Sequence, residues 1–126
     1  MTDATRQWTG RGLSAVAVVF LAFDGGIKLT KLPIVLEATA QLGFSPSSII
    51  LIGILLLACT VVYVVPRTRI VGAVLLTGYL GGAVAAHVRV GNPPFEMVFP
   101  IIVATVVWAG IFIRDQRARA LIASCR

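Results

Sequence analysis

The stretch from residue 66 to residue 94 most tightly constrains what this chain can fold into. It begins with a basic turn at residues 66–69 (PRTR), continues as an apolar, glycine-rich run over residues 70–86, and ends with residues 87–94 (HVRVGNPP). Up to Val90 the apolar part is about 20 residues long, which is the length that a helix needs to cross a bilayer. Proline stops a helix from continuing at either end. We therefore predict a membrane-spanning helix over residues 70–90.

Three other apolar segments have the same character. We predict spans over residues 13–32, 46–65 and 95–113. Residues 33–45 are too short to span, and we expect an interfacial segment there. The turn at residues 66–69 is so short that its two flanking spans must run antiparallel. The predicted fold class is all-α: an integral membrane, antiparallel four-helix bundle in a single domain over residues 1–126.

The composition supports a membrane location and excludes other classes of protein. Apolar residues make up 58% of the chain and charged residues only 13%, against about 25% charged in soluble domains. A soluble domain of this size could not bury so much apolar surface. The net charge of +6 comes mostly from arginines that flank the apolar segments, without the interleaved aromatics of a nucleic-acid-binding groove. The lipid bilayer is the expected partner, and nucleic acid is not.

Basic residues near the ends of the spans predict the orientation of the bundle. Four spans place both termini and the turn at residues 66–69 on one side, and positive charge in such loops marks the cytoplasmic side. The opposite side carries Lys28, Lys31 and Arg89. We predict a multi-pass protein of the plasma (inner) membrane with both termini in the cytoplasm. The eight arginines on the terminal side are Arg6, Arg11, Arg67, Arg69, Arg114, Arg117, Arg119 and Arg126.

Small residues are predicted to set how closely the helices pack. Helices in lipid associate through close contact of small residues, because no hydrophobic force drives them together. On the third span, small residues recur every four positions, and the first and second spans also carry glycines. We expect these positions to permit backbone contact rather than to bind a ligand. They are Gly26, Gly53, Gly78, Gly81, Gly82 and Ala86.

Polar residues from separate spans approach the end of the bundle opposite the termini. Asp24 and Lys28 are four residues apart with the acid first, the favourable order for an ion pair on a helix. A charge within the membrane costs at least about 2.5–3.5 kcal/mol, so such residues face inward and pair. In one interpretation this pair only neutralises itself. In the other, Tyr79 and His87 join it to form a pocket for the polar end of an amphipathic ligand.

Two further charges lie at the same level, at the ends of the third and fourth spans. Arg89 is expected to extend toward the membrane surface or to form an ion pair with Glu96 rather than to contact a ligand. The sequence contains no nucleophile–base pair, no cofactor fingerprint and no set of metal ligands. Independent catalysis and a metal site are therefore not expected.

Several motifs in the chain match a known pattern. Residues 23–29 (FDGGIKL) and 41–46 (QLGFSP) form its opening half, and residues 63–68 (YVVPRT), 77–83 (TGYLGGA) and 87–89 (HVR) form its central block. Phe99-Pro100, Trp108 and the run RDQR at residues 114–117 match its close. Together these motifs resemble the DoxX-like family of small four-span membrane proteins.

The resemblance implies a four-span bundle and, less specifically, a link to quinone chemistry. Some relatives are associated with membrane oxidoreductase assemblies, including a thiosulfate:quinone oxidoreductase. This chain departs from the pattern at residues 53–57, where many relatives carry a glutamate, and at Ala86, where many carry threonine. Three functions remain open: a binding or accessory subunit that holds a quinone or lipid-like ligand for a membrane oxidoreductase partner, a structural protein that docks another protein or its own copies, and a proton-coupled or small-molecule transporter.

Overall fold

The computed structural model describes residues 2–30 and 33–125. The predicted first span includes Lys31 and Leu32, and the comparison of basic residues on the two sides includes Lys31 and Arg126. These three residues lie outside the described ranges. Four of the helices in the described ranges are long and apolar enough to cross a membrane, which confirms the predicted all-α four-helix bundle. The helices are α1 (Asp3–Leu29), α2 (Pro33–Gln41), α3 (Pro46–Val64), α4 (Arg69–Val90), α5 (Pro94–Arg114) and α6 (Gln116–Ala123).

Local sequence signals set the ends of α3, α4 and α5. Proline occupies the first turn of α3 and of α5, where a missing N–H does no harm. Gly91 ends α4 in the left-handed conformation with φ 71°, and the N–H of Asn92 bonds back to the His87 carbonyl at 3.1 Å. The predicted spans over residues 46–65, 70–90 and 95–113 agree with these helices to within one residue at each end.

Helix α1 is longer than predicted at its N-terminus. It begins at Asp3 rather than at residue 13, because the Thr2 side chain caps it by accepting a hydrogen bond from the Thr5 N–H at 3.1 Å. Its 27 residues extend about 40 Å at 1.5 Å per residue, which exceeds the hydrocarbon thickness of about 30 Å. The Arg11 guanidinium lies 5.5 Å from the centre of the Trp8 ring, an amphipathic contact suited to the membrane surface.

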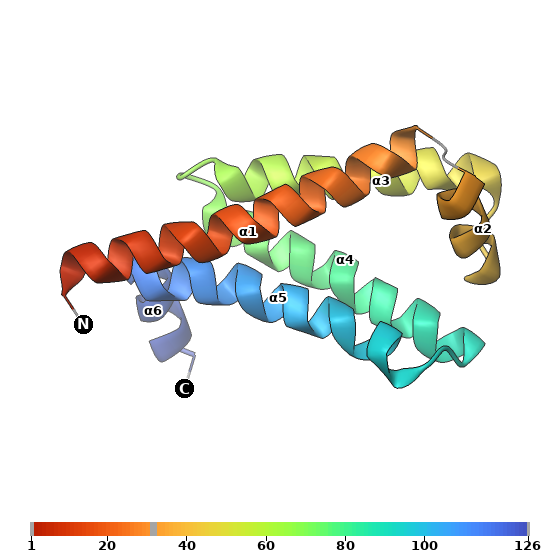
Figure 1. Cartoon of the computed structure of the whole chain (residues 1–126). Helices are drawn as coiled ribbons and strands as arrows, with labels where there is room; N and C mark the ends of the chain where they lie inside the picture. The colour runs from red at the N-terminus through yellow and green to blue at the C-terminus, as the bar shows by residue number, and fades with distance from the viewer. Residues whose placement is uncertain (1, 31–32, 126) are drawn as a thin grey trace.

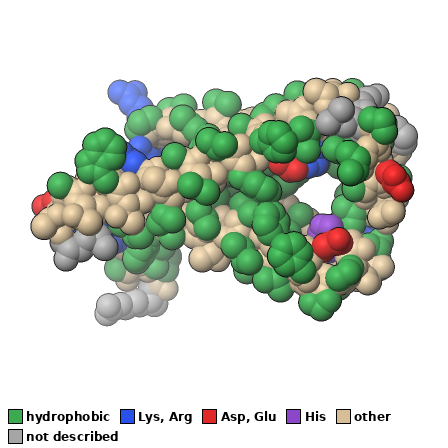
Figure 2. Space-filling model, in the orientation of Figure 1, with side chains coloured by type: hydrophobic (Ala, Val, Ile, Leu, Met, Phe, Trp, Pro, Cys, Tyr) green, Lys and Arg blue, Asp and Glu red, His purple; other side chains and the backbone are tan. Residues whose placement is uncertain are grey.

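The four long helices form a ring in which each packs on two neighbours. Helix α1 contacts α3 and α5, and α4 contacts the same two helices. Figure 1 shows both termini at one end of the bundle, while toward the other end the pair α1–α3 diverges from the pair α4–α5. We call these the basic end and the open end. Helix α2 lies across the open end (Figure 1). Apolar side chains cover much of the visible surface (Figure 2), as a surface that faces lipid requires.

The packed core fills the half of the bundle nearer the basic end. Leu56, Leu76, Val107 and Ile111 are completely buried there. Toward the open end the last buried core residue of α4 is Leu80. The helices beyond this level are not joined by a continuous core, and this difference between the two halves positions the site described below.

The glycines that bring the helices together are not the ones predicted, with one exception. Gly53 does lie at a close approach, because a Cβ there would lie 3.1 Å from the Gly25 carbonyl oxygen. The other close approaches involve glycines that were not singled out. A Cβ at Gly72 would collide with the backbone of Tyr63, and a Cβ at Gly110 would collide with Ser14.

The predicted packing stripe on α4 is wrong. A Cβ at Gly78, Gly81 or Gly82 would meet no atom within 4 Å, and the same holds for Gly26 on α1. Gly78, Gly82 and Ala86 instead line a cavity. The periodicity correctly placed them on one face of α4, but that face points toward the space between the diverging helix pairs rather than toward a neighbouring helix.

Candidate functional site

A cavity of about 470 Å³ lies at the open end between the two helix pairs. Apolar side chains from α1, α3, α4 and α5 form most of its wall, and the glycine stripe on α4 keeps it open. Figure 2 shows an opening through this end, with acidic, basic and histidine side chains at its edge. The four polar residues that the sequence grouped together all line this cavity: Asp24, Lys28, Tyr79 and His87.

Asp24 and Lys28 form the predicted ion pair. The Lys28 Nζ lies 2.6 Å from Asp24 Oδ2, and the two side chains are 16% and 32% exposed respectively. An ammonium group has three N–H donors, and this contact uses one of them. The pair therefore neutralises its charge within the membrane and leaves donors of Lys28 for a further acceptor.

His87 is held by a residue that the sequence reasoning missed. The side-chain amide of Asn92 lies 2.7 Å from His87 Nδ1. Because an amide nitrogen can only donate, Nδ1 accepts, and the proton of the neutral ring then lies on Nε2. The turn at Gly91 reverses the chain and places Asn92 beside the ring. A glycine helix end followed directly by a polar side chain was the available signal.

Arg89 and Glu96 do not pair with each other, so the predicted alternative of an ion pair is wrong. The Arg89 guanidinium donates to the Leu42 carbonyl at 2.6 Å, and Glu96 Oε2 lies 3.8 Å from His87 Nδ1. The reason is helical geometry, since Arg89 is two residues after His87 and therefore points to the other side of α4. It reaches the loop after α2, while the start of α5 brings Glu96 to the face that carries His87.

Helix α2 and the loop after it contribute to the cavity wall through Thr39, Leu42 and Phe44. Gly43 turns the chain in the left-handed region with φ 91°, and a side chain there would meet the Arg89 guanidinium. The segment predicted to lie at the membrane interface is therefore also part of the candidate site. It closes the end of the cavity that lies farthest from the core.

Aromatic contacts between α1 and α5 form another wall. The rings of Phe20 and Phe99 meet edge-on with centroids 5.3 Å apart, and Phe95 lies 5.8 Å from Phe99. Phe20 and Phe99 also line the cavity. An edge-on pair contributes about 0.5–1.5 kcal/mol beyond its buried area, so these rings hold the two helices together beside the polar groups.

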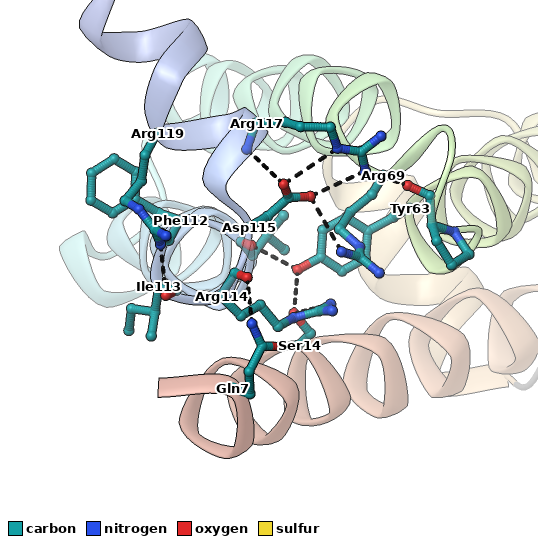
Figure 3. Close-up of polar contacts among 12 residues, drawn as sticks. Gln7, Ser14, Tyr63, Arg69, Phe112, Ile113, Arg114, Asp115, Arg117 and Arg119 are labelled. Atoms are coloured by element: carbon teal, nitrogen blue, oxygen red, sulfur yellow. Dashed lines mark hydrogen bonds and ion pairs between the residues drawn. The ribbon is translucent and has the colours of Figure 1, made fainter. Parts of the chain in front are cut away.

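A network of polar side chains joins the helices at the basic end. The Tyr63 hydroxyl donates to the Val107 carbonyl at 2.7 Å and lies 2.8 Å from Ser14 Oγ. Ser14 Oγ also accepts from Arg114 at 3.2 Å. Figure 3 shows these side chains converging from α1, α3 and α5. The network joins three helices where Gly110 lets α1 and α5 approach.

Asp115 links the ends of α4, α5 and α6. Helix α5 ends at Arg114, and Asp115 after it is extended (φ −115°, ψ 112°) and caps α6. Its carboxylate accepts from Arg69 at 3.3 Å and from the Arg117 N–H at 2.9 Å. The side chain is only 6% exposed. Arg69 and Arg117, which the sequence assigns to the cytoplasmic side, therefore also join the helix ends through Asp115.

The stability of the protein is expected to depend on the ionisation of Asp115. Burial raises the pKa of this carboxyl, but the hydrogen bonds from Arg117 and the charges of Arg117 and Arg69 outweigh it, so the pKa lies below its ordinary value of 3.8. A group with a lowered folded-state pKa stabilises the protein above its unfolded-state pKa, and this stabilisation is lost as the pH falls through the folded-state value. Asp115→Asn should lower Tm at pH 7 and reduce the loss of Tm on acidification below pH 4.

Thermal unfolding in detergent at pH 7, 5 and 3 measures this effect. The exposed acid Glu37 on α2 provides the control, and Glu37→Gln should follow the wild-type curve. If the Tm of Asp115→Asn fell as much between pH 5 and pH 3 as that of the wild type, the ionised Asp115 carboxylate would not stabilise the fold.

The comparison with known families covers most of the chain. A family model described as DoxX-like matches residues 12–110. No curated protein and no solved structure matches. The matched range contains every residue that lines the cavity at the open end. It ends before Arg114, Asp115 and α6.

Proposed function

The chain belongs to the DoxX-like family of membrane proteins, and we propose that it is a binding subunit whose open-end cavity holds an amphipathic ligand, a quinone or lipid-like molecule, for a redox partner in the membrane. The observation that carries the proposal is the meeting of Asp24, Lys28, Tyr79 and His87, from two different helices, on one largely apolar cavity.

The size and lining of the cavity support this proposal. Ligand sites in proteins have volumes of about 300–1,000 Å³ and combine apolar walls with a few polar groups, and this cavity has about 470 Å³. Phe20, Phe99 and Val103 on its wall suit a hydrocarbon chain. The divergence of the helix pairs gives such a chain a route from the surrounding lipid.

The donors at the cavity fit a quinone ring. Quinone oxygens are hydrogen-bond acceptors, and the Lys28 ammonium, the Tyr79 hydroxyl and the proton-bearing Nε2 of His87 are donors on residues that line the cavity. A bound quinone would supply the ability to take up two electrons and two protons. The residues themselves would orient one carbonyl, and the phenylalanine rings would exclude water from it.

The core below the cavity favours a binding role over a transporter. Transport by alternating access requires the site to open to both sides in turn. Completely buried side chains, among them Leu76, Val107 and Ile111, fill the bundle between the cavity and the basic end. A ligand that enters at the open end would therefore be held there and not passed on.

Neutralising the ion pair distinguishes a ligand site from a self-neutralising pair. The double variant Asp24→Asn/Lys28→Gln keeps two side chains of similar size that can hydrogen-bond and leaves no charge unpaired in the membrane. Loss of a charge-assisted hydrogen bond to the ligand should lower its recovery about tenfold, while Tm should change little. The measurement is mass spectrometry of the lipids extracted from protein purified in mild detergent.

Glu37→Gln is the matched control, since Glu37 is exposed on α2 and does not line the cavity. It should recover the same ligand in the same amount as the wild type. Wild-type protein without any enriched quinone or lipid, or a double variant that recovers as much as the wild type, would contradict the proposed function.

A further inference from the structure

A second cavity, of about 440 Å³, lies at the basic end and is lined almost entirely by charged and amide side chains. It is formed by the first turns of α1, the start of α4 and the junction between α5 and α6. Among the residues that line it, five arginines face two aspartates, which leaves three positive charges uncompensated at neutral pH. The arginines are Arg6, Arg69, Arg114, Arg117 and Arg119, and the acids are Asp3 and Asp115.

Two of these arginines have donors that the described part of the protein does not satisfy. Arg69 donates from Nη1 to Asp115, and Arg114 donates from Nη2 to Ser14. The Nε groups of both are buried and have no hydrogen-bond partner within the described residues. Each guanidinium has five N–H donors, and a buried donor without an acceptor costs about 1–3 kcal/mol. The unused terminal N–H groups of these two lining side chains remain available to an acceptor in the cavity.

Other contacts hold Arg117 and Arg119 in place before anything binds. Arg119 donates from Nη1 to the carbonyls of Phe112 and Ile113 at 2.6 and 2.7 Å, and Arg117 donates to the Pro66 carbonyl at 2.7 Å. These bonds occupy part of each guanidinium and leave other N–H groups available. Figure 3 shows Arg117 and Arg119 on α6, with Arg69 and Arg114 near Asp115.

This arrangement matches one ligand chemistry. A phosphate group carries up to two negative charges and has several acceptor oxygens, and guanidinium forks bind it with paired hydrogen bonds. The cavity lies beyond the apolar part of the spans, at the level where lipid headgroups are expected. Apart from Arg69, its lining residues fall outside the range matched by the family model.

We propose that the cavity at the basic end binds a phosphate group, carried either by an anionic lipid headgroup or by a free phosphate solute. The site is separate from the cavity at the open end, since the completely buried core lies between them. A phosphate bound in this cavity would connect α6 to α1 and α4, because the arginines that line it come from α1, α4, α5 and α6.

Arg6 gives the cleanest variant with which to test this site. It lines the cavity, and no hydrogen bond or ion pair joins its side chain to another described residue, so Arg6→Gln should fold normally. Arg11→Gln is the matched control: it removes the same charge from the same helix, but Arg11 is exposed and does not line the cavity.

The test has two arms, both with the full chain. In the first, calorimetry in nonionic detergent measures binding of inorganic phosphate at constant ionic strength. In the second, Tm is compared in nanodiscs of phosphatidylglycerol and of phosphatidylcholine. In at least one arm the wild type should bind phosphate or gain stability. Arg6→Gln should weaken phosphate binding about tenfold, equivalent to the loss of one charge-assisted contact, and should reduce the gain in Tm. Arg11→Gln should leave both responses unchanged.

The pattern across the arms identifies the source of the phosphate. A response to phosphatidylglycerol alone indicates a lipid headgroup, a response to inorganic phosphate alone indicates a free solute, and both responses indicate that the site accepts either. The proposal is overturned if neither probe has an effect, or if Arg6→Gln and Arg11→Gln weaken the response equally.

Discussion

Gly72→Ala is expected to destabilise the protein more than any other exchange of one glycine for alanine on α4. A Cβ at this position would collide with the backbone of Tyr63 and approach that of Val62 within 2.7 Å. Backbone cannot move aside as the end of a side chain can, so the α3–α4 hairpin would have to open. Overpacking of this kind typically costs about 1–3 kcal/mol. The same movement would displace the Tyr63 hydroxyl from Ser14 and Val107. Thermal unfolding in detergent should show a clear fall in Tm.

Gly82→Ala is the matched control on the same helix. A Cβ there would meet no atom within 4 Å, and alanine favours a helix over glycine by up to about 1 kcal/mol. This variant should therefore be as stable as the wild type or more stable. Equal losses of Tm in Gly72→Ala and Gly82→Ala would show that the sequence stripe on α4 does pack against a helix, contrary to the structure.

The features that the sequence predicted correctly depend on local signals. Proline can occupy only the first turn of a helix without loss of a hydrogen bond, and glycine can adopt positive φ without strain. The positions of Pro46, Gly91 and Pro94 therefore defined three of the spans to within one residue. The spacing of Asp24 and Lys28 likewise defined a contact within a single helix, and that ion pair is present.

The features that the sequence did not predict depend on how the helices are arranged. Periodicity shows which residues share a face of α4, but not whether a helix or a cavity lies opposite, so Gly78 and Gly82 were assigned to the wrong role. The Arg89 side chain donates to the carbonyl of Leu42 because α2 lies across the open end. The contacts that stabilise the end of α5 at Asp115 were not predicted either. Asp115 contacts Arg117, two residues later, and Arg69, which is distant in the sequence.

The candidate site shows the same division between local and long-range information. The grouping of Asp24, Lys28, Tyr79 and His87 was predictable because depth along a helix follows from residue count, and all four line one cavity. The contribution of Thr39 and Phe44 was not predictable, since it depends on the path of the chain after α1. Neither was the role of Asn92, which contacts His87 only because the chain reverses at Gly91.

Gly82→Leu is expected to block the cavity at the open end without disturbing the fold. Gly82 lines this cavity, and the space around a Cβ at this position is empty to 4 Å. A leucine side chain would therefore occupy the volume that the proposed ligand needs. Gly81→Leu is the closest control, because Gly81 is adjacent on α4, has the same free space, and lines a different groove between α4 and α5. Both variants should keep the wild-type Tm.

The dissociation constant for decylubiquinone, a quinone with a short alkyl chain, tests the proposed ligand site most directly. Isothermal titration of the purified protein in detergent gives this constant for the wild type, Gly82→Leu and Gly81→Leu. The wild type and Gly81→Leu should bind the quinone equally, and Gly82→Leu should bind it at least about tenfold more weakly, a difference of about 1.4 kcal/mol. Quinone binding that is absent from the wild type, or that is unchanged in Gly82→Leu, would contradict a quinone site in this cavity.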